Sequence, residues 1–136
     1  MNKVKELINK NSENFIIKSN QSESVISEAE QKLGFKFDSV YEEYLKELGS
    51  ISFESMECLG LGRSDSSYLN VVNITKEIIN AEKSFPNNAV VLEDIGEGNC
   101  VIYIMNKGVF QYSVSSLDLI TKTIEEYLLM RFKEMS

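Results

Sequence analysis

Histidine, the side chain that most often serves as a general base or a catalytic metal ligand, is absent from this chain of 136 residues. Its absence excludes Ser-His-Asp and Cys-His catalysis and nearly all catalytic zinc sites. The sequence also lacks a P-loop and a dinucleotide-binding glycine fingerprint. Paired carboxylates acting on a sugar remain open as an enzyme mechanism, but no particular pair stands out. We therefore expect no enzyme, no cofactor and no metal.

The two cysteines, Cys58 and Cys100, each lie among apolar residues and form no Cys-x-x-Cys motif. This pattern indicates reduced thiols in or near the core, rather than a metal site or a disulfide framework.

Acidic side chains outnumber basic ones by 21 to 14, which gives a net charge of −7. A nucleic-acid ligand or an anionic membrane surface would require a basic footprint, so the charge argues against both and we expect neither as a partner. The charge instead favours a basic partner, because opposite fields speed encounter. No apolar run approaches the ~20 residues of a membrane span, and no signal peptide is evident. We expect a cytoplasmic protein with one domain over residues 1–136.

Two windows, residues 47–62 and 84–106, contain acidic side chains and no basic ones. Their acidic residues are Glu47, Glu54, Glu57, Glu93, Asp94 and Glu97. If both windows lie on or beside a sheet, they could form one acidic patch for a basic protein; the alternative is an ordinary solvated face. Tyr68 follows in a polar loop, where it could anchor an interface or pack on its own domain. The candidate partner-binding residues are Glu54, Glu57, Tyr68, Glu93, Asp94 and Glu97.

The turn at residues 94–99 could be mistaken for a calcium loop, but it lacks the spaced aspartates and the bidentate glutamate of such loops. Gly96 and Gly98 instead indicate a hairpin turn that requires positive φ.

Hydrophobic periodicity sets the expected elements. We expect helices over residues 1–18, 23–33, 39–48, 72–83 and 117–132. We expect one or two strands within 51–62, and further strands at 89–92, 100–105 and 109–114. Ser39 and Glu42 have capping-box spacing, and Asn73 or Thr75 would cap the fourth helix. Helices that flank consecutive strands predict an α+β fold, with an antiparallel sheet covered by N-terminal and C-terminal helices.

Several segments resemble the SUKH superfamily, which includes yeast cell-wall-assembly regulators and bacterial immunity proteins. The first is residues 26–49, where a helix bearing glutamates leads to Leu33-Gly34, then to Tyr41 and to Tyr44-Leu45. The others are the glycine strand at 59–62, the acidic glycine turn at 94–99, the strand at 108–112 and the helix at 123–128. Asp38, where the family usually has proline, and the absence of tryptophan are departures from the pattern.

The resemblance implies a strongly curved antiparallel sheet covered by helices and no known catalysis. It also implies an immunity protein that occludes a cognate toxin, here a basic, nuclease-type one. The alternative is a regulatory scaffold of the cell-wall-regulator type with several partners. The oligomeric state, monomer or homodimer, stays open.

Overall fold

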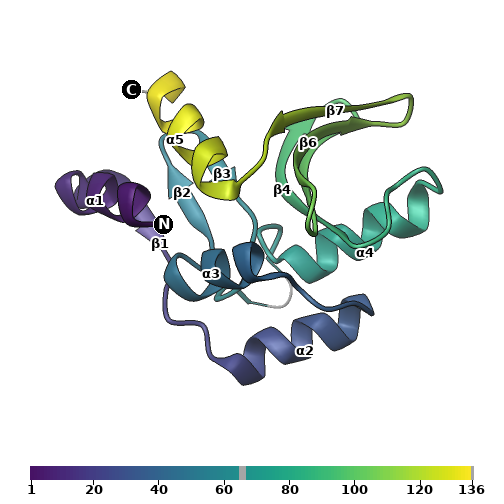
Figure 1. Ribbon diagram of the computed structural model, residues 1–136, viewed down its shortest axis with the longest axis horizontal. Helices are drawn as coiled ribbons and strands as arrows, with labels where there is room; N and C mark the ends of the chain where they lie inside the picture. The colour runs from purple at the N-terminus through teal and green to yellow at the C-terminus, as the bar shows by residue number, and fades with distance from the viewer. Residues whose placement is uncertain (65–66, 136) are drawn as a thin grey trace.

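A computed structural model describes residues 1–64 and 67–135, and it shows an α+β arrangement of two antiparallel sheets and surrounding helices (Figure 1). The first sheet has the order β1-β2-β3, formed by Phe15–Ile17, Ile51–Phe53 and Met56–Cys58. The second has the order β4-β5-β6-β7, formed by Ala89–Gly96, Asn99–Ile104, Gly108–Ser113 and Ser116–Thr121. The helices are α1 (Asn2–Lys10), α2 (Glu23–Leu33), α3 (Ser39–Glu47), α4 (Val71–Ala81) and α5 (Ile124–Met135). The fold class expected from the sequence is therefore confirmed.

Helix α2 begins and ends where the sequence indicates. The Ser22 hydroxyl accepts a hydrogen bond from the Val25 N–H, and Gly34 closes the helix with φ of 85°, a conformation that glycine adopts without strain.

Helix α3 is capped by Asp38, so the prediction that Ser39 is the cap was wrong. Asp38 Oδ1 accepts from the Tyr41 N–H at 2.9 Å. Its other oxygen accepts from the Tyr103 hydroxyl at 2.6 Å and from the Asn106 N–H at 2.7 Å. One carboxylate thus caps the N-terminus of α3 and fixes the helix to β5.

Helix α4 is capped by Asn70, not by Asn73 or Thr75 as expected. The Asn70 side-chain oxygen, Oδ1, accepts from the N–H groups of Val72 and Asn73. Thr75 is buried and accepts from the Val91 N–H, so it attaches α4 to β4 instead.

The first predicted helix, over residues 1–18, was too long. Helix α1 ends at Lys10, a 3₁₀ turn covers Ser12–Asn14, and β1 pairs with β2. Phe15 faces Phe53 across this pair, and their rings stack with centroids 4.3 Å apart. A cross-strand partner 38 positions away in the sequence therefore overrides the local helical spacing.

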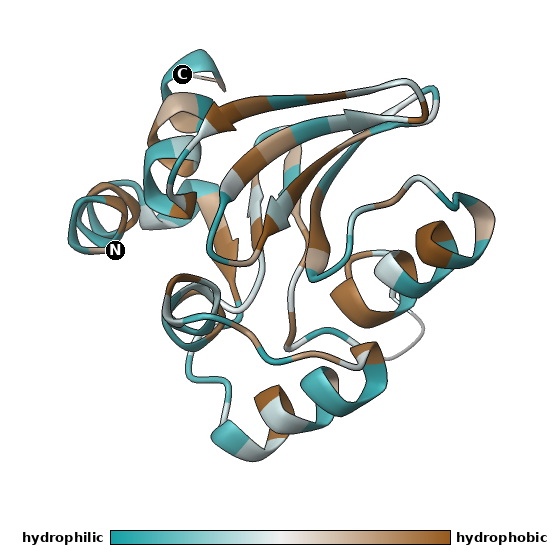
Figure 2. Ribbon diagram, turned by 45° about the vertical axis from the view of Figure 1, so that its right-hand side comes forward, coloured by the Kyte–Doolittle hydropathy of each residue, from teal (hydrophilic) through white to brown (hydrophobic). Residues whose placement is uncertain are grey.

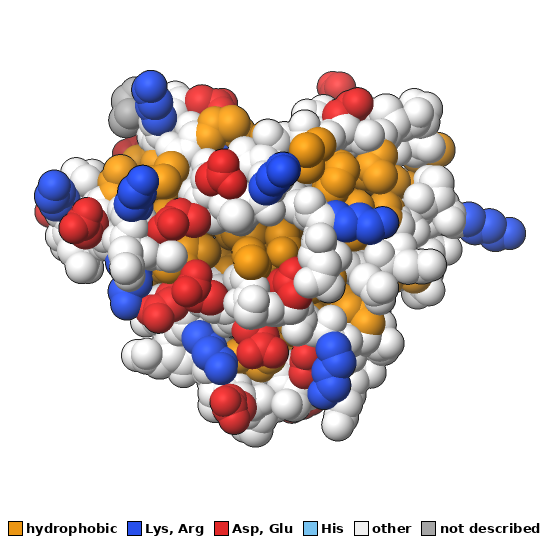
Figure 3. Space-filling model, in the orientation of Figure 1, with side chains coloured by type: hydrophobic (Ala, Val, Ile, Leu, Met, Phe, Trp, Pro, Cys, Tyr) orange, Lys and Arg blue, Asp and Glu red, His pale blue; other side chains and the backbone are white. Residues whose placement is uncertain are grey.

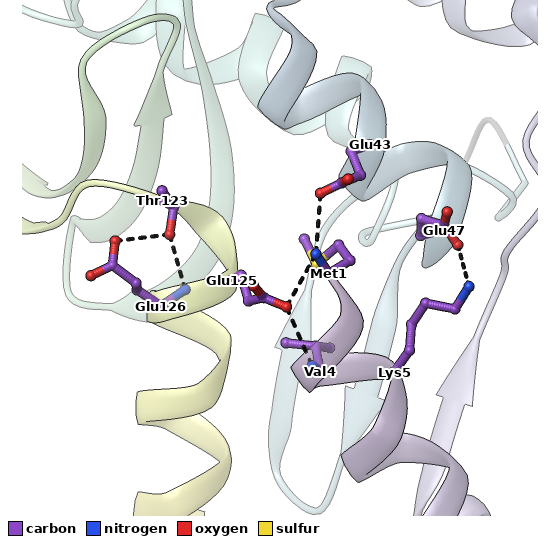
Figure 4. Close-up of polar contacts among 8 residues, drawn as sticks. All are labelled: Met1, Val4, Lys5, Glu43, Glu47, Thr123, Glu125 and Glu126. Atoms are coloured by element: carbon purple, nitrogen blue, oxygen red, sulfur yellow. Dashed lines mark hydrogen bonds and ion pairs between the residues drawn. The ribbon is translucent and has the colours of Figure 1, made fainter.

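Helix α1 is held against α3 and α5 by polar contacts (Figure 4). Lys5 pairs with Glu47 at 2.7 Å, which accounts for one acidic residue of the first window. Glu125 of α5 accepts from the Val4 N–H and pairs with the Met1 amino group at 3.1 Å. Burial opposes the charged form of Glu125, but these hydrogen bonds prevail and hold the pKa of its carboxyl below its ordinary value.

The last predicted helix, over 117–132, was wrong in its first half. Residues 116–121 form β7, joined to β6 by a two-residue turn, and α5 begins at Ile124. The second sheet curls over α4, so one of its faces is concave (Figure 2). The predicted strands at 51–62, 89–92, 100–105 and 109–114 are all present, the first as the β2–β3 hairpin.

The core lies between the sheets and helices. It includes four tyrosines that are at most 2% exposed, namely Tyr41, Tyr44, Tyr103 and Tyr127. Gly60 lies against the backbone near Gly49, where a Cβ would come within 1.6 Å of a carbonyl oxygen. Only a glycine allows so close an approach of two backbone segments at this position.

Candidate partner-binding surface

Glu93 lies inside the protein rather than on an acidic surface. It is 3% exposed, and its carboxylate accepts a bidentate pair from Arg131 of α5, with contacts of 2.9 and 3.0 Å. The Tyr127 hydroxyl donates to the same carboxylate. The basic residue that neutralises Glu93 thus comes from a segment far along the chain, and Glu93 offers no free charge to a partner.

This buried cluster stabilises the junction of β4 and α5. The hydrogen bond that the Arg131 guanidinium donates to Glu93 raises the pKa of Arg131. Burial first, and then the Glu93 charge, raise the pKa of Tyr127 and of the Cys58 thiol. All three groups are therefore held in their ordinary protonation states.

The second thiol is equally unsuited to nucleophilic chemistry. Burial, and then the charge of Asp94, raise the pKa of Cys100 to about 12. Since the thiolate is the reactive form, neither cysteine is activated, as expected for core thiols. Within residues 1–64 and 67–135, no group of three histidine, cysteine or carboxylate side chains could hold a metal ion.

Glu57 and Tyr68, two of the candidate residues, are brought together at the surface. The Tyr68 hydroxyl donates to Glu57 Oε2 at 2.8 Å, and that hydrogen bond raises the pKa of the phenol. Tyr68 is 66% exposed, so its ring is not packed on its own domain. The two side chains form one polar and aromatic unit, in which Tyr68 is exposed and Glu57 is half-buried.

Glu54 and the Asp94–Glu97 segment lie at the tips of two different hairpins. Glu54 is in the two-residue turn between β2 and β3, with φ of 53°. Glu97 and Gly98 form the turn between β4 and β5, both with positive φ. This is the hairpin turn predicted for the two glycines. Asp94 is exposed, and its carboxylate accepts from the Gly96 N–H at 2.9 Å.

Apolar side chains of β7 form an exposed surface that the sequence analysis missed. Leu117 and Leu119 are 44% and 53% exposed. They lie opposite Tyr112 and Phe110 of β6, and so share one face of the sheet. Figure 3 shows hydrophobic side chains at the surface between β7 and α4, on the concave side of the sheet. We call the set Phe110, Leu117 and Leu119 the β7 strip.

The β7 strip borders a shallow hollow of 220 Å³ between the β6–β7 turn and the segment after α4. Tyr112 forms its floor, packing edge-on against Phe85 and sharing a 2.6 Å hydrogen bond with Ser84. Pro86 and Leu117 line its sides. Helix α4 packs on β4 and the segment after it contacts Tyr112 of β6, whereas Leu117 and Leu119 of β7 stay exposed.

The sequence contains a signal for the strand that carries the strip, although the periodicity analysis assigned residues 117–121 to a helix. Leu117 and Leu119 alternate with Asp118, and Thr121 and Ile120 are β-branched, which is typical of a strand. The adjoining helical pattern from Ile124 onward was extended across them.

Comparisons with known proteins agree on the fold. A family model, SUKH_5, described as SMI1-KNR4 cell-wall, matches residues 1–134. A solved structure described as a protein from Pseudomonas syringae pv. tomato superposes with a TM-score of 0.66 at 16% identity, and the match covers 81% of this chain and 83% of that one. Among curated proteins, no match was found. None of the helices in the described part of the chain has the length and apolar character that a bilayer crossing requires.

Proposed function

Since this chain belongs to the SUKH superfamily, we propose that it is an immunity protein that binds a cognate bacterial toxin domain and neutralises it by occlusion. Membership of this family supports a role in protein–protein interaction, and the described residues show no activated nucleophile or metal cluster that would add chemistry.

The observation that carries this proposal is the β7 strip. Aliphatic side chains that lie together on the exposed face of a sheet mark a protein-interaction surface more often than chance exposure does. Leu117 lines the hollow over Tyr112, and Leu119 follows it on the same face of the sheet, so a partner's apolar side chain could enter the hollow beside Leu117. Such a pocketed apolar centre is typical of the residues that dominate binding energy.

Acidic side chains supply the second part of the proposal. Of the residues nominated from the sequence, Glu54, Glu57, Asp94 and Glu97 reach the surface, and Tyr68 stands with Glu57. With the net charge of −7, they would speed the approach of a basic, nuclease-type toxin. Glu93 does not belong to this set, because its carboxylate is buried and neutralised by the ion pair with Arg131.

The family description favours one alternative. The words cell-wall in the name of the matching model suit a regulatory scaffold that binds several partners weakly. An immunity protein should instead hold one basic partner tightly.

The test is a capture experiment with the tagged protein as bait, cell lysate as the source, and washes of increasing salt. We expect one dominant basic partner that is toxic when expressed alone and harmless when this chain is co-expressed. Several weakly held partners without toxicity would support the scaffold and refute the immunity role.

A matched pair of variants tests the surface. Replacing Leu117 and Leu119 by serine should weaken partner binding about tenfold or more. Ile16→Ser is the control, because Ile16 is 57% exposed on β1 of the other sheet. Equal binding by both variants would exclude the β7 strip.

A further inference from the structure

Strand β7 is the last strand of its sheet, and β6 is its only neighbour among the described residues. The two-residue turn makes Ser113 and Ser116 a hydrogen-bonded pair, and bonded and non-bonded pairs alternate along an antiparallel ladder. Leu117 and Leu119 therefore stand at positions that make no backbone hydrogen bonds to β6. Their N–H and C=O groups lie in the plane of the sheet and point away from β6, toward the free edge.

Two of the usual devices that prevent another strand from pairing are missing at this edge. Natural edge strands are protected by charged side chains, above all lysine, by proline, by β-bulges or by covering segments. Residues 116–121 contain neither lysine nor proline, Asp118 is their one charge, and the register shift of β7 lies beyond Leu119, between the pairs Phe110–Leu119 and Val109–Thr121. The two residues whose backbone faces outward are also the exposed leucines of the β7 strip, so the free hydrogen-bonding groups and the free apolar surface coincide.

One charge on β7 decides what kind of strand fits. Asp118 is exposed on the opposite face from the leucines, and its cross-strand neighbour Gln111 is neutral. No salt bridge within the described part of the chain involves Asp118.

A second copy of the chain fits this edge poorly. An antiparallel two-fold pairing that uses the outward groups of both leucines places Leu117 opposite the second copy's Leu119. It then places the two copies of Asp118 directly opposite each other. Like charges at opposed positions destabilise a strand pair, so Asp118 acts against self-association.

We propose that β7 binds an extended segment of the partner by antiparallel strand addition, and that it selects an apolar–basic–apolar tripeptide. The basic side chain lies opposite Asp118, and its apolar neighbours lie opposite Leu117 and Leu119 on the concave face. This inference rests on the proposed function, since it names how the basic partner is held. Main-chain hydrogen bonds supply affinity in this mode, and the alternating side chains supply specificity.

The probe is the peptide Ac-Thr-Val-Lys-Val-Thr-NH₂, compared with the same peptide carrying glutamate in place of lysine. Binding is followed on the ¹⁵N-labelled full chain by NMR shifts and amide hydrogen exchange. We expect the Leu117 and Leu119 amides to exchange fast in the free protein and to be protected by the lysine peptide. The lysine peptide should bind about threefold to tenfold more tightly than the glutamate peptide.

A charge swap separates strand addition from general attraction to an acidic protein. Asp118→Lys should reverse the preference between the two peptides. Glu6→Lys, an exposed site on α1 with the same change in net charge, should leave it unchanged. Leu119→Pro removes one outward N–H at an edge position that tolerates proline, and it should abolish the protection. Equal affinity for both peptides, or protection at other amides, would overturn the proposal.

The outcome is independent of the toxin assay. If the wild type captures one toxin and Asp118→Lys captures it equally well, strand addition is refuted and the immunity role stands. If no toxin is captured but the peptide preference reverses, the immunity role fails and the strand-addition site stands.

Discussion

Arg131→Met tests the most heavily buried charge pair in the protein. Glu93 is 3% exposed and accepts two contacts from the guanidinium, at 2.9 and 3.0 Å. Removing one partner of a fully buried pair costs about 3–5 kcal/mol, because the other charge is left without compensation. The Arg131 side chain is 21% exposed, so water can reach part of the vacated site. We therefore expect a loss near the lower limit, about 3 kcal/mol of unfolding free energy.

The assay is urea unfolding followed by far-UV circular dichroism. Glu134→Gln is the control, since it removes only the solvent-exposed contact of Arg131 and should cost less than about 1 kcal/mol. The double variant Glu93→Gln, Arg131→Met neutralises both partners and should be more stable than Arg131→Met alone by about 1 kcal/mol or more. Additive losses in the double variant would show that the pair is not coupled, and would refute the reasoning.

Four further variants or measurements follow from local geometry. Gly60→Ala should cost more than about 3 kcal/mol by urea unfolding, because its Cβ would lie 1.6 Å from a carbonyl oxygen; a near-neutral result would contradict that close packing. Asn70→Ala should cost about 1 kcal/mol and Asn73→Ala much less, since only Asn70 caps α4; equal losses would reject this assignment. Cys100, with its pKa raised to about 12, should resist Ellman's reagent at pH 8 until the chain unfolds, and rapid labelling of the folded protein would count against this. The lowered pKa of Glu125 means that its stabilising contribution is present above pH 4.5 and is lost as pH falls through the folded pKa. Glu125→Gln should thus flatten the acid limb of thermal stability measured against pH, and an unchanged limb would disprove this contribution.

The sequence by itself determined the class of fold and most of its elements. Helix α2 is bounded by local signals, a serine cap and a left-handed glycine, so no distant contact is needed to define it. The β2–β3 and β4–β5–β6 hairpins likewise follow from strand patterns joined by short turns. The absence of histidine and the buried, protonated thiols were also readable, because they depend on composition and on adjacent apolar residues.

Other features depend on contacts that no local pattern encodes. Residues 15–17 become a strand because Phe15 stacks on Phe53, and Asp38 caps α3 while it also binds β5. In the candidate surface, Glu93 and Asp94 are neighbours in the sequence but have opposite environments. Successive side chains of a strand point to opposite faces of the sheet. Helix α5 places Arg131 on the face that holds Glu93, and Asp94 lies on the other face.

The largest difference between sequence and structure lies at β7, and it concerns the proposed site. The apolar spacing of residues 117–120 suits a strand face as well as the start of a helix, so composition could not distinguish an inward stripe from an exposed one. Only the pairing with β6, and the limited reach of α4 across the sheet, leave Leu117 and Leu119 at a free edge. Periodicity shows that a face is apolar, whereas the packing of distant elements decides whether anything covers it.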